Sequence, residues 1–323
     1  MQFQLPLDIE RLPTPITYKD KILLTGSCFT EHISGRLAQY KFNVLANPNG
    51  ILFNPMSVAE SIDSYLDGRV YEPQDLFPLN ELWNSWQHHT RFSHIDKTEA
   101  LNNINTAQKE AAAFVKSADK IIITLGSAFQ YYLKEGNKGV ANNHRGPAQW
   151  FHKTLLSIDT IVNALGNTLQ KLSTANPYAT VIFTISPVRH VRDGVIENNR
   201  SKARLVEAVH TLCSTYPNTY YFPSYELVID ILRDHRYYDI DLVHPNYAAT
   251  SYVWHQFEKA CIDAQTINIM KEVQDIVTAY HHKPRFPETE GHRNFMKMYS
   301  AKIKDLQERH PYLNLKEEIS YFG

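Results

Sequence analysis

Short apolar runs alternate with longer amphipathic stretches along most of the chain, and this alternation limits the possible folds more than any other feature. Five runs rich in β-branched or aromatic residues are typical of buried strands. They lie at 21–25, 42–45, 120–125, 180–185 and 218–222. Amphipathic stretches that predict helices lie near 30–40, 56–67, 97–117, 154–174, 200–215, 224–234 and 247–263. The alternation predicts a three-layer α/β/α domain with a mostly parallel five-stranded sheet.

The pattern changes near residue 264. Two further helical stretches, near 266–281 and 292–309, are separated by the proline-containing break HHKPRFPETEGH. About 60 residues of modest apolar content would be marginally stable alone. We therefore expect an α/β domain over 1–263 and a helical extension over 264–323 that packs on the same body.

Composition excludes several classes of protein. The 323 residues carry a formal net charge of −1, so no global field favours nucleic acid or an anionic membrane as a partner. Three widely spaced cysteines argue against a disulfide framework and fit a reducing compartment. With no signal peptide or apolar membrane span in the sequence, we expect a cytoplasmic protein. The oligomeric state is left open.

The stretch KILLTGSCFT ends the first predicted strand with a candidate nucleophile. Gly26 allows a sharp turn, and Ser27 then stands at the entry to a helix. A serine there can be a nucleophile and an oxyanion donor at once, although this motif alone favours a simple helix cap. Cys28 is an alternative nucleophile, but a small packing residue is the more economical interpretation.

A candidate base lies near the other end, in YDIDLVHP. Asp241 and His244 are three residues apart, just before a helix that Pro245 favours. A carboxylate at this spacing can orient an imidazole and stabilise its protonated form. The alternative is a structural Asp–His pair at a helix end.

Together these two motifs resemble the SGNH/GDSL hydrolase superfamily, and more closely its bacterial GSCFA branch. Further stretches resemble that family in the same order: FNVLANPNGILFNP, SWQHHTRFSH, ITLGSAFQYY, VANNHRGP, TISPVRHVRDG and FPSYELVIDILRDHRYYDIDLVHP. The resemblance implies a flavodoxin-like strand order and a Ser27–His244–Asp241 triad. It implies neither a metal ion nor an organic cofactor.

The resemblance also implies an oxyanion hole, with one departure. The N–H groups of Ser27 and Gly50 match two of the usual donors, but Ala128 stands where the superfamily has an asparagine. We expect the side chain of Asn142 or Asn143 to replace it, with His144 as a further candidate.

Two polar segments are candidate binding elements. In SWQHHTRFSH, the residues Trp86, His88 and His89 suit a pocket wall for a carbohydrate, with a core role for Trp86 as the alternative and a zinc site disfavoured by spacing. His144 joins this group. After the fourth strand, Arg189 and His190 are expected at the functional edge, where they could bind an acidic group or a leaving oxygen, with a solvated loop as the alternative.

The resemblance implies a serine esterase, and with the aromatic loops it leads us to expect an acyl or acetyl ester of a carbohydrate as the substrate. One alternative is an O-acyltransferase that passes the acyl group to a sugar hydroxyl. The other is a carbohydrate-binding protein that keeps the fold without the activity, for which the missing asparagine at position 128 argues.

Overall fold

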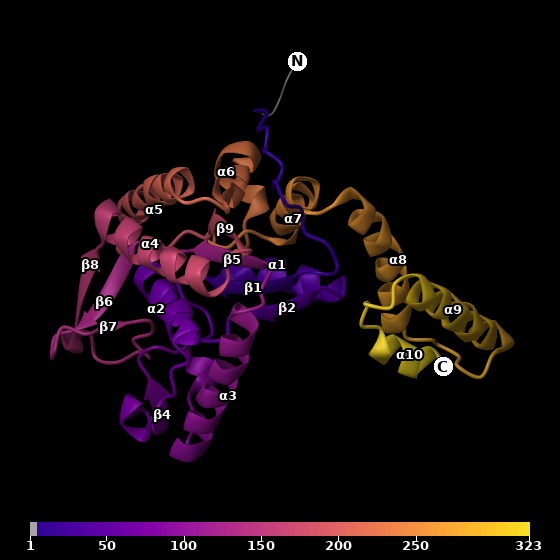
Figure 1. Ribbon diagram of the computed structural model, residues 1–323, viewed down its shortest axis with the longest axis horizontal. Helices are drawn as coiled ribbons and strands as arrows, with labels where there is room; N and C mark the ends of the chain where they lie inside the picture. Colours follow the sequence, from indigo (N-terminus) through magenta and orange to yellow (C-terminus); the bar gives the residue numbers. More distant parts are fainter. Residues whose placement is uncertain (1–4) are drawn as a thin grey trace.

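The computed structural model describes residues 5–323, and its centre is a five-stranded parallel sheet (Figure 1). The strands are β1 (Lys21–Gly26), β2 (Asn43–Ala46), β5 (Lys120–Leu125), β9 (Thr180–Ile185) and β10 (Thr219–Phe222). Their order is β10-β9-β5-β1-β2, with every neighbouring pair parallel. This is the flavodoxin-like order, so the predicted fold class is confirmed.

Helices cover both faces of the sheet because successive strand residues point to opposite sides. One face lies under α1 (Cys28–Gln39) and α7 (Tyr247–Cys261), and the other under α2 (Pro55–Leu66), α3 (Lys97–Val115), α4 (Ile158–Ala175) and α5 (Val195–Thr215). Ile22 and Leu24 belong to the first apolar layer, and Leu23 between them belongs to the second. All carboxyl ends of the strands meet at one edge.

The helix predicted at 224–234 is a short α6 (Ser224–Glu226) followed by a π-helical turn (Leu227–Leu232). Short 3-10 turns lie at Pro73–Asp75, Thr90–Phe92, Ala148–Trp150, Val191–Asp193 and His235–Tyr237. The other helices predicted before residue 264 are present, with ends that differ by a few residues. The stretch at 154–174 was predicted to become helical too early, because its first residues end a strand.

Two small antiparallel sheets escape the sequence pattern. A hairpin pairs β3 (Leu76–Leu79) with β4 (Leu82–Ser85), and a three-stranded sheet has the order β7-β6-β8 (Gly139–Val140, Phe129–Leu133, Phe151–Leu155). The hairpin turns at Asn80 and Glu81, both at positive φ. That conformation favours Gly or Asn at both positions, so the sequence carried a weak hairpin signal.

The C-terminal helices are α8 (Ala264–His281), α9 (Glu290–Arg309) and α10 (Lys316–Phe322), of which α10 was not predicted. Figure 1 places them at the opposite side of the sheet from β6, β7 and β8. Their apolar residues continue the same buried cluster that lies beneath α1 and α7. Among the helices of residues 5–323, none combines the length and apolarity that crossing a bilayer requires.

Candidate active site

Ser27 lies at the carboxyl edge of the sheet, where β1 ends and α1 begins. The turn depends on Gly26, whose φ is +143° and whose missing side chain would overlap the carbonyl oxygen of Thr124. Ser27 is the N-cap of α1, with extended backbone (φ −70°, ψ 175°). Its side chain makes no capping hydrogen bond, so the hydroxyl does not satisfy an N–H group at the start of the helix.

The hydroxyl of Ser27 is buried and has no hydrogen-bond partner within the described chain. The residue is 0% exposed. A buried polar group without a partner costs about 1–3 kcal/mol, and folded proteins rarely leave one. The fold therefore keeps an unused hydroxyl at the positive end of a helix.

Asp241 and His244 form the pair that their spacing suggested. The Nδ1 of His244 lies 2.6 Å from Oδ2 of Asp241. The N–H groups of His244 and Val243 donate to Oδ1 of Asp241, at 3.0 and 2.9 Å. These bonds lower the pKa of Asp241 to about 2, and the bond from the main-chain N–H of His244 contributes most. A carboxylate so held leaves Nε2 of His244 as the free ring nitrogen, on a side chain that is 47% exposed.

Three side chains converge on the bare face of Gly126, just after β5. A Cβ built there would lie 3.1 Å from Cβ of Ser27, 3.2 Å from Nε2 of His190 and 3.3 Å from the ring of Phe53. The Nε2 of His190 is itself buried without a partner. Two unpaired polar atoms, the Ser27 hydroxyl and the His190 nitrogen, therefore face one small region of the site.

His190 is held as a neutral imidazole. Its pKa is lowered to about 3, mainly by burial and to a smaller extent by the nearby positive charge of Lys202. Its ring stands edge-on to Phe53, with centroids 5.3 Å apart. Across residues 5–323, no hydrogen bond joins the Ser27 hydroxyl to His244. Because Ser27 is also fully buried, its hydroxyl contacts neither His244 nor solvent in this arrangement.

One face of α5 supports the loops around Ser27, and the sequence did not point to it. Asn198 accepts the N–H of His190 (2.9 Å), and Ser201 accepts the N–H of Ala128 (2.7 Å). Lys202, fully buried, donates to the carbonyl of Gly126 (2.7 Å). Besides the resemblance of NRSKARL to the GSCFA family, the available signal was their i, i+3, i+4 spacing, which places them on one helix face.

Both main-chain donors expected in an oxyanion hole are occupied. The N–H of Ser27 donates to the Thr124 carbonyl (3.0 Å), and the N–H of Gly50 donates to the Asn47 carbonyl (2.7 Å). The first bond continues the ladder between β1 and β5, and the second closes a turn at which Gly50 has a φ of +80°. Neither N–H is free to meet an oxyanion in this arrangement.

The side chains expected to replace the missing asparagine serve local turns. The Oδ1 of Asn142 accepts the N–H of His144 (2.8 Å), and the Oδ1 of Asn143 accepts the N–H of Arg145 (3.3 Å). His144 is buried, and its Nε2 lies 2.7 Å from the Ser85 carbonyl oxygen. These bonds stabilise the loop between β7 and β8.

The aromatic segment before α3 is buried at His88 and half-buried at Trp86 and His89. His88 is 1% exposed, with Nδ1 at 2.8 Å from Oγ of Ser85, and burial lowers its pKa to about 3. Trp86 stacks on Phe77 with ring centroids 3.6 Å apart. His88 thus packs in the interior and does not line an open pocket. His89 is half-buried and packs against Gly50, so it alone of this group lies near the turn after β2.

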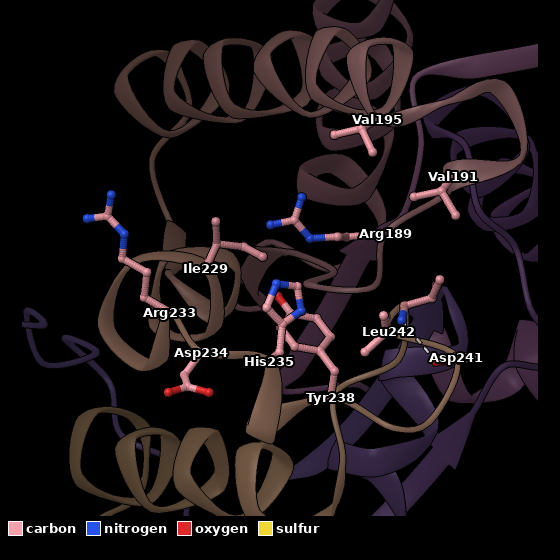
Figure 2. Close-up of a pocket in the computed structure, with 11 residues that line it drawn as sticks. Arg189, Val191, Val195, Ile229, Arg233, Asp234, His235, Tyr238, Asp241 and Leu242 are labelled. Atoms are coloured by element: carbon pink, nitrogen blue, oxygen red, sulfur yellow. Dashed lines mark hydrogen bonds between the residues drawn. The ribbon is translucent and has the colours of Figure 1, made fainter.

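Arg189 lines a cleft of about 530 Å³ that also contains Asp241 (Figure 2). Its N–H donates to the carbonyl of Val243 (3.2 Å), which joins the loop after β9 to the turn that carries His244. Arg189 and His190 are consecutive, yet one lines the cleft and the other lies against Gly126.

Comparison with known proteins gives one family. The sequence model of the GSCFA family matches residues 21–257, and that of the GSCFA domain protein C-terminal domain matches residues 273–323. No curated protein matches the chain.

Several solved structures are similar at low identity. A putative platelet activating factor from Streptococcus pneumonia has 14% identity and a TM-score of 0.37, over 74% of this chain and 83% of that one. A carbohydrate esterase family 3 structure from Talaromyces cellulolyticus has 12% identity and a TM-score of 0.36, over 78% of this chain and 99% of that one. An acetyl xylan esterase from the rumen bacterium Butyrivibrio proteoclasticus has 11% identity and a TM-score of 0.35, over 76% of this chain and 65% of that one. Likeness at this level assigns no activity.

Proposed function

The chain belongs to the GSCFA family, and from that premise and the geometry of the site we propose that it is a serine ester hydrolase with Ser27, His244 and Asp241 as its triad. One observation carries the proposal. The edge of the sheet that holds a buried, unpaired serine hydroxyl at a helix N-terminus also holds an imidazole fixed by a carboxylate at 2.6 Å. This is the set of groups that acyl transfer needs.

In the proposed reaction, Oγ of Ser27 attacks the ester carbonyl while Nε2 of His244 takes the hydroxyl proton. His244 then returns that proton to the leaving alcohol, and an acyl-serine remains. Water, deprotonated by His244, then attacks the acyl carbonyl. The bond to Oγ of Ser27 breaks, the acid leaves, and His244 returns the proton to the Ser27 oxygen. Asp241 stays ionised throughout and stabilises the imidazolium.

Substrate must open the site before this reaction can begin. Ser27 has no exposed surface, and the rings of His190 and Phe53 lie with it against Gly126. We propose that the ester carbonyl displaces the Phe53 ring and enters beside Gly126. Closing the site over substrate would exclude water from the acyl-enzyme step.

The oxyanion is assigned to His190 and to the first turn of α1. A general base needs a stabilised imidazolium, and the cations around His190 oppose one. A neutral imidazole can instead donate from Nε2, which is the unpaired atom beside Ser27. The N–H groups at the start of a helix have no intrahelical partner, which makes Cys28 and Phe29 the main-chain donors.

The substrate class proposed first is an acyl ester, with acetylated carbohydrates as the first group to screen. An acyltransferase would use the same acyl-enzyme, and the exposed His244 could deprotonate a sugar hydroxyl in place of water. Saturation of turnover by an added acceptor would favour the transferase.

A fluorophosphonate probe tests the triad. We expect one adduct, located on Ser27 by peptide mass spectrometry. The variants Ser27→Ala and His244→Ala should abolish labelling, and Asp241→Asn should slow it by about 10²-fold or more. Cys28→Ser is the matched control, because it alters the adjacent residue and should label normally. An adduct on Cys28, or none on the folded protein, would overturn the proposal.

A further inference from the structure

The cleft of about 530 Å³ is large enough for a small-molecule ligand and lies beside the proposed triad (Figure 2). Three segments form its walls: the loop after β9, the π-helical turn with the residues that follow it, and the turn that carries Asp241. The loop after β9 also carries His190, and the turn carries His244. A ligand in the cleft would therefore contact both loops that hold proposed catalytic groups.

The cleft contains two arginines without acidic partners. Within residues 5–323, neither the Arg189 nor the Arg233 guanidinium makes an ion pair or a side-chain hydrogen bond. Figure 2 shows Arg189 extending from the loop after β9 and Arg233 from the segment after the π-helical turn, with Ile229 between them. Arginine is well suited to oxygen anions, because its planar donors match a carboxylate or phosphate.

The acidic residues of the cleft do not neutralise these arginines, since each already has a partner. Asp241 holds His244, and it accepts two main-chain N–H groups as well. Asp234 pairs with Nε of Arg236 at 3.2 Å. Neither aspartate is paired with Arg189 or Arg233, so both guanidinium groups keep their hydrogen-bond donors free for a ligand.

Apolar side chains line the same cleft while remaining open to solvent. Val195 is 54% exposed and Leu242 is 55% exposed, and Val191 lies beside them. Covering such surface with a ligand is favourable in proportion to the apolar area removed from water. A matching ligand has an apolar part next to its charge.

We propose that this cleft binds an acidic group of the substrate, so that the preferred ester carries a carboxylate, phosphate or sulfate beside an apolar portion. That the bound anion belongs to a substrate rests on the proposed hydrolase function, whereas anion binding in the cleft does not require turnover. Arg189 and Arg233 hold the anion, and Leu242 and Val195 contact the apolar part.

Matched esters test the proposal. One pair is 4-acetoxybenzoate and its methyl ester, and the other is mono(4-nitrophenyl) succinate and its methyl ester, which place the charge on the alcohol and the acyl side. We expect the wild type to prefer the charged member of at least one pair. The double variant Arg189→Gln/Arg233→Gln should lower the ratio of kcat/KM for the charged ester to kcat/KM for its methyl ester by about tenfold or more. Arg192→Gln is the control, because Arg192 is exposed on the same loop outside the cleft.

Binding of phenyl phosphate, with phenol as the neutral control, separates the two proposals. Binding by the wild type and by the Arg192 variant, but not by the double variant, supports the cleft even if no ester is hydrolysed. That result without turnover would count against the hydrolase alone. Equal binding by all three proteins, or ester ratios that the double variant leaves unchanged, would overturn the anion site.

Discussion

At the scale of single residues, the site is defined by polar atoms that the fold leaves unpaired. The Ser27 hydroxyl and the His190 Nε2 are both buried without partners, and both lie against Gly126. An apolar pair of similar shape would avoid the cost of burying them. Other buried atoms of residues 5–323 are unpaired as well, so it is the position of these two beside Gly126 that distinguishes the site.

His190→Phe should keep the ring and remove the donor. If His190 binds the oxyanion, we expect kcat for ester hydrolysis to fall by about 10²- to 10³-fold with KM little changed. His190→Asn should recover part of the loss, because an amide N–H can donate. Full activity in a folded His190→Phe protein would show that the donor lies elsewhere.

Gly26→Ala should be strongly destabilising. The residue has a φ of +143°, and a methyl group there would overlap the Thr124 carbonyl oxygen. We expect the free energy of unfolding in urea to fall by about 3 kcal/mol or more. Gly35→Ala in α1 is the control, since nothing lies within 4 Å of its added Cβ, and it should be neutral or slightly stabilising. Similar effects for both would contradict the steric explanation.

At the scale of elements, α5 holds the edge of the sheet together. Lys202 joins the ends of two strands, because its Nζ donates to the carbonyl of Gly126 after β5 and to that of Ser186 after β9, at 2.7 and 2.6 Å. The pKa of Lys202 is lowered to about 7, because the effect of burial outweighs the opposing effect of Cys28. The cation is therefore kept in the interior by carbonyl dipoles, without a carboxylate.

Lys202→Met should reveal this cost through its pH dependence. Between about pH 7 and the usual lysine pKa near 10.5, the unfolded chain binds the proton that folded Lys202 has released. The stability of the wild type relative to Lys202→Met should therefore rise with pH, by up to about 1.4 kcal/mol per unit above pH 7. Urea unfolding of both proteins from about pH 7 to pH 9 measures the difference. A constant difference would mean that Lys202 stays charged when folded.

At the scale of the whole molecule, the C-terminal helices share a core with the α/β domain. Met270, Val273, Ile303 and Phe322 belong to the same buried cluster as residues of β1 and α7. An ion pair adds to this contact, with Nζ of Lys41 at 2.6 Å from Oε1 of Glu318. This is a close ionic contact without the alignment of a hydrogen bond.

Lys41→Met should weaken this attachment, because it leaves the carboxylate of Glu318 buried without a cation. Glu318 is 1% exposed, and breaking a buried pair costs about 3 kcal/mol. Glu317→Gln is the control, since Glu317 is 72% exposed and its pair with Lys41 is screened. The double variant Lys41→Met/Glu318→Met should recover most of the loss in urea unfolding. Equal effects of Lys41→Met and Glu317→Gln would contradict this account.

The sequence by itself determined the central sheet and the position of Ser27. Local patterns suffice for both, because strand and helix periods are read from neighbouring residues and Gly26 marks the turn. The Asp241–His244 hydrogen bond likewise follows from a spacing of three residues. The hairpin of β3 and β4 was missed because its turn at Asn80 and Glu81 carries a weak signal. Gly136 and Asn137 between β6 and β7 are a stronger hairpin signal, which went unused.

Only the tertiary structure decided what surrounds the serine. The approach of His190 and Phe53 to Gly126 brings together residues from three separate loops. The occupied N–H groups of Ser27 and Gly50 depend on carbonyls that the sheet and a turn supply. His88 reads as a binding residue in sequence and is buried in the fold. The physical reason is the same in each case: hydrogen-bond partners and burial are set by contacts between distant segments, which local sequence patterns do not encode.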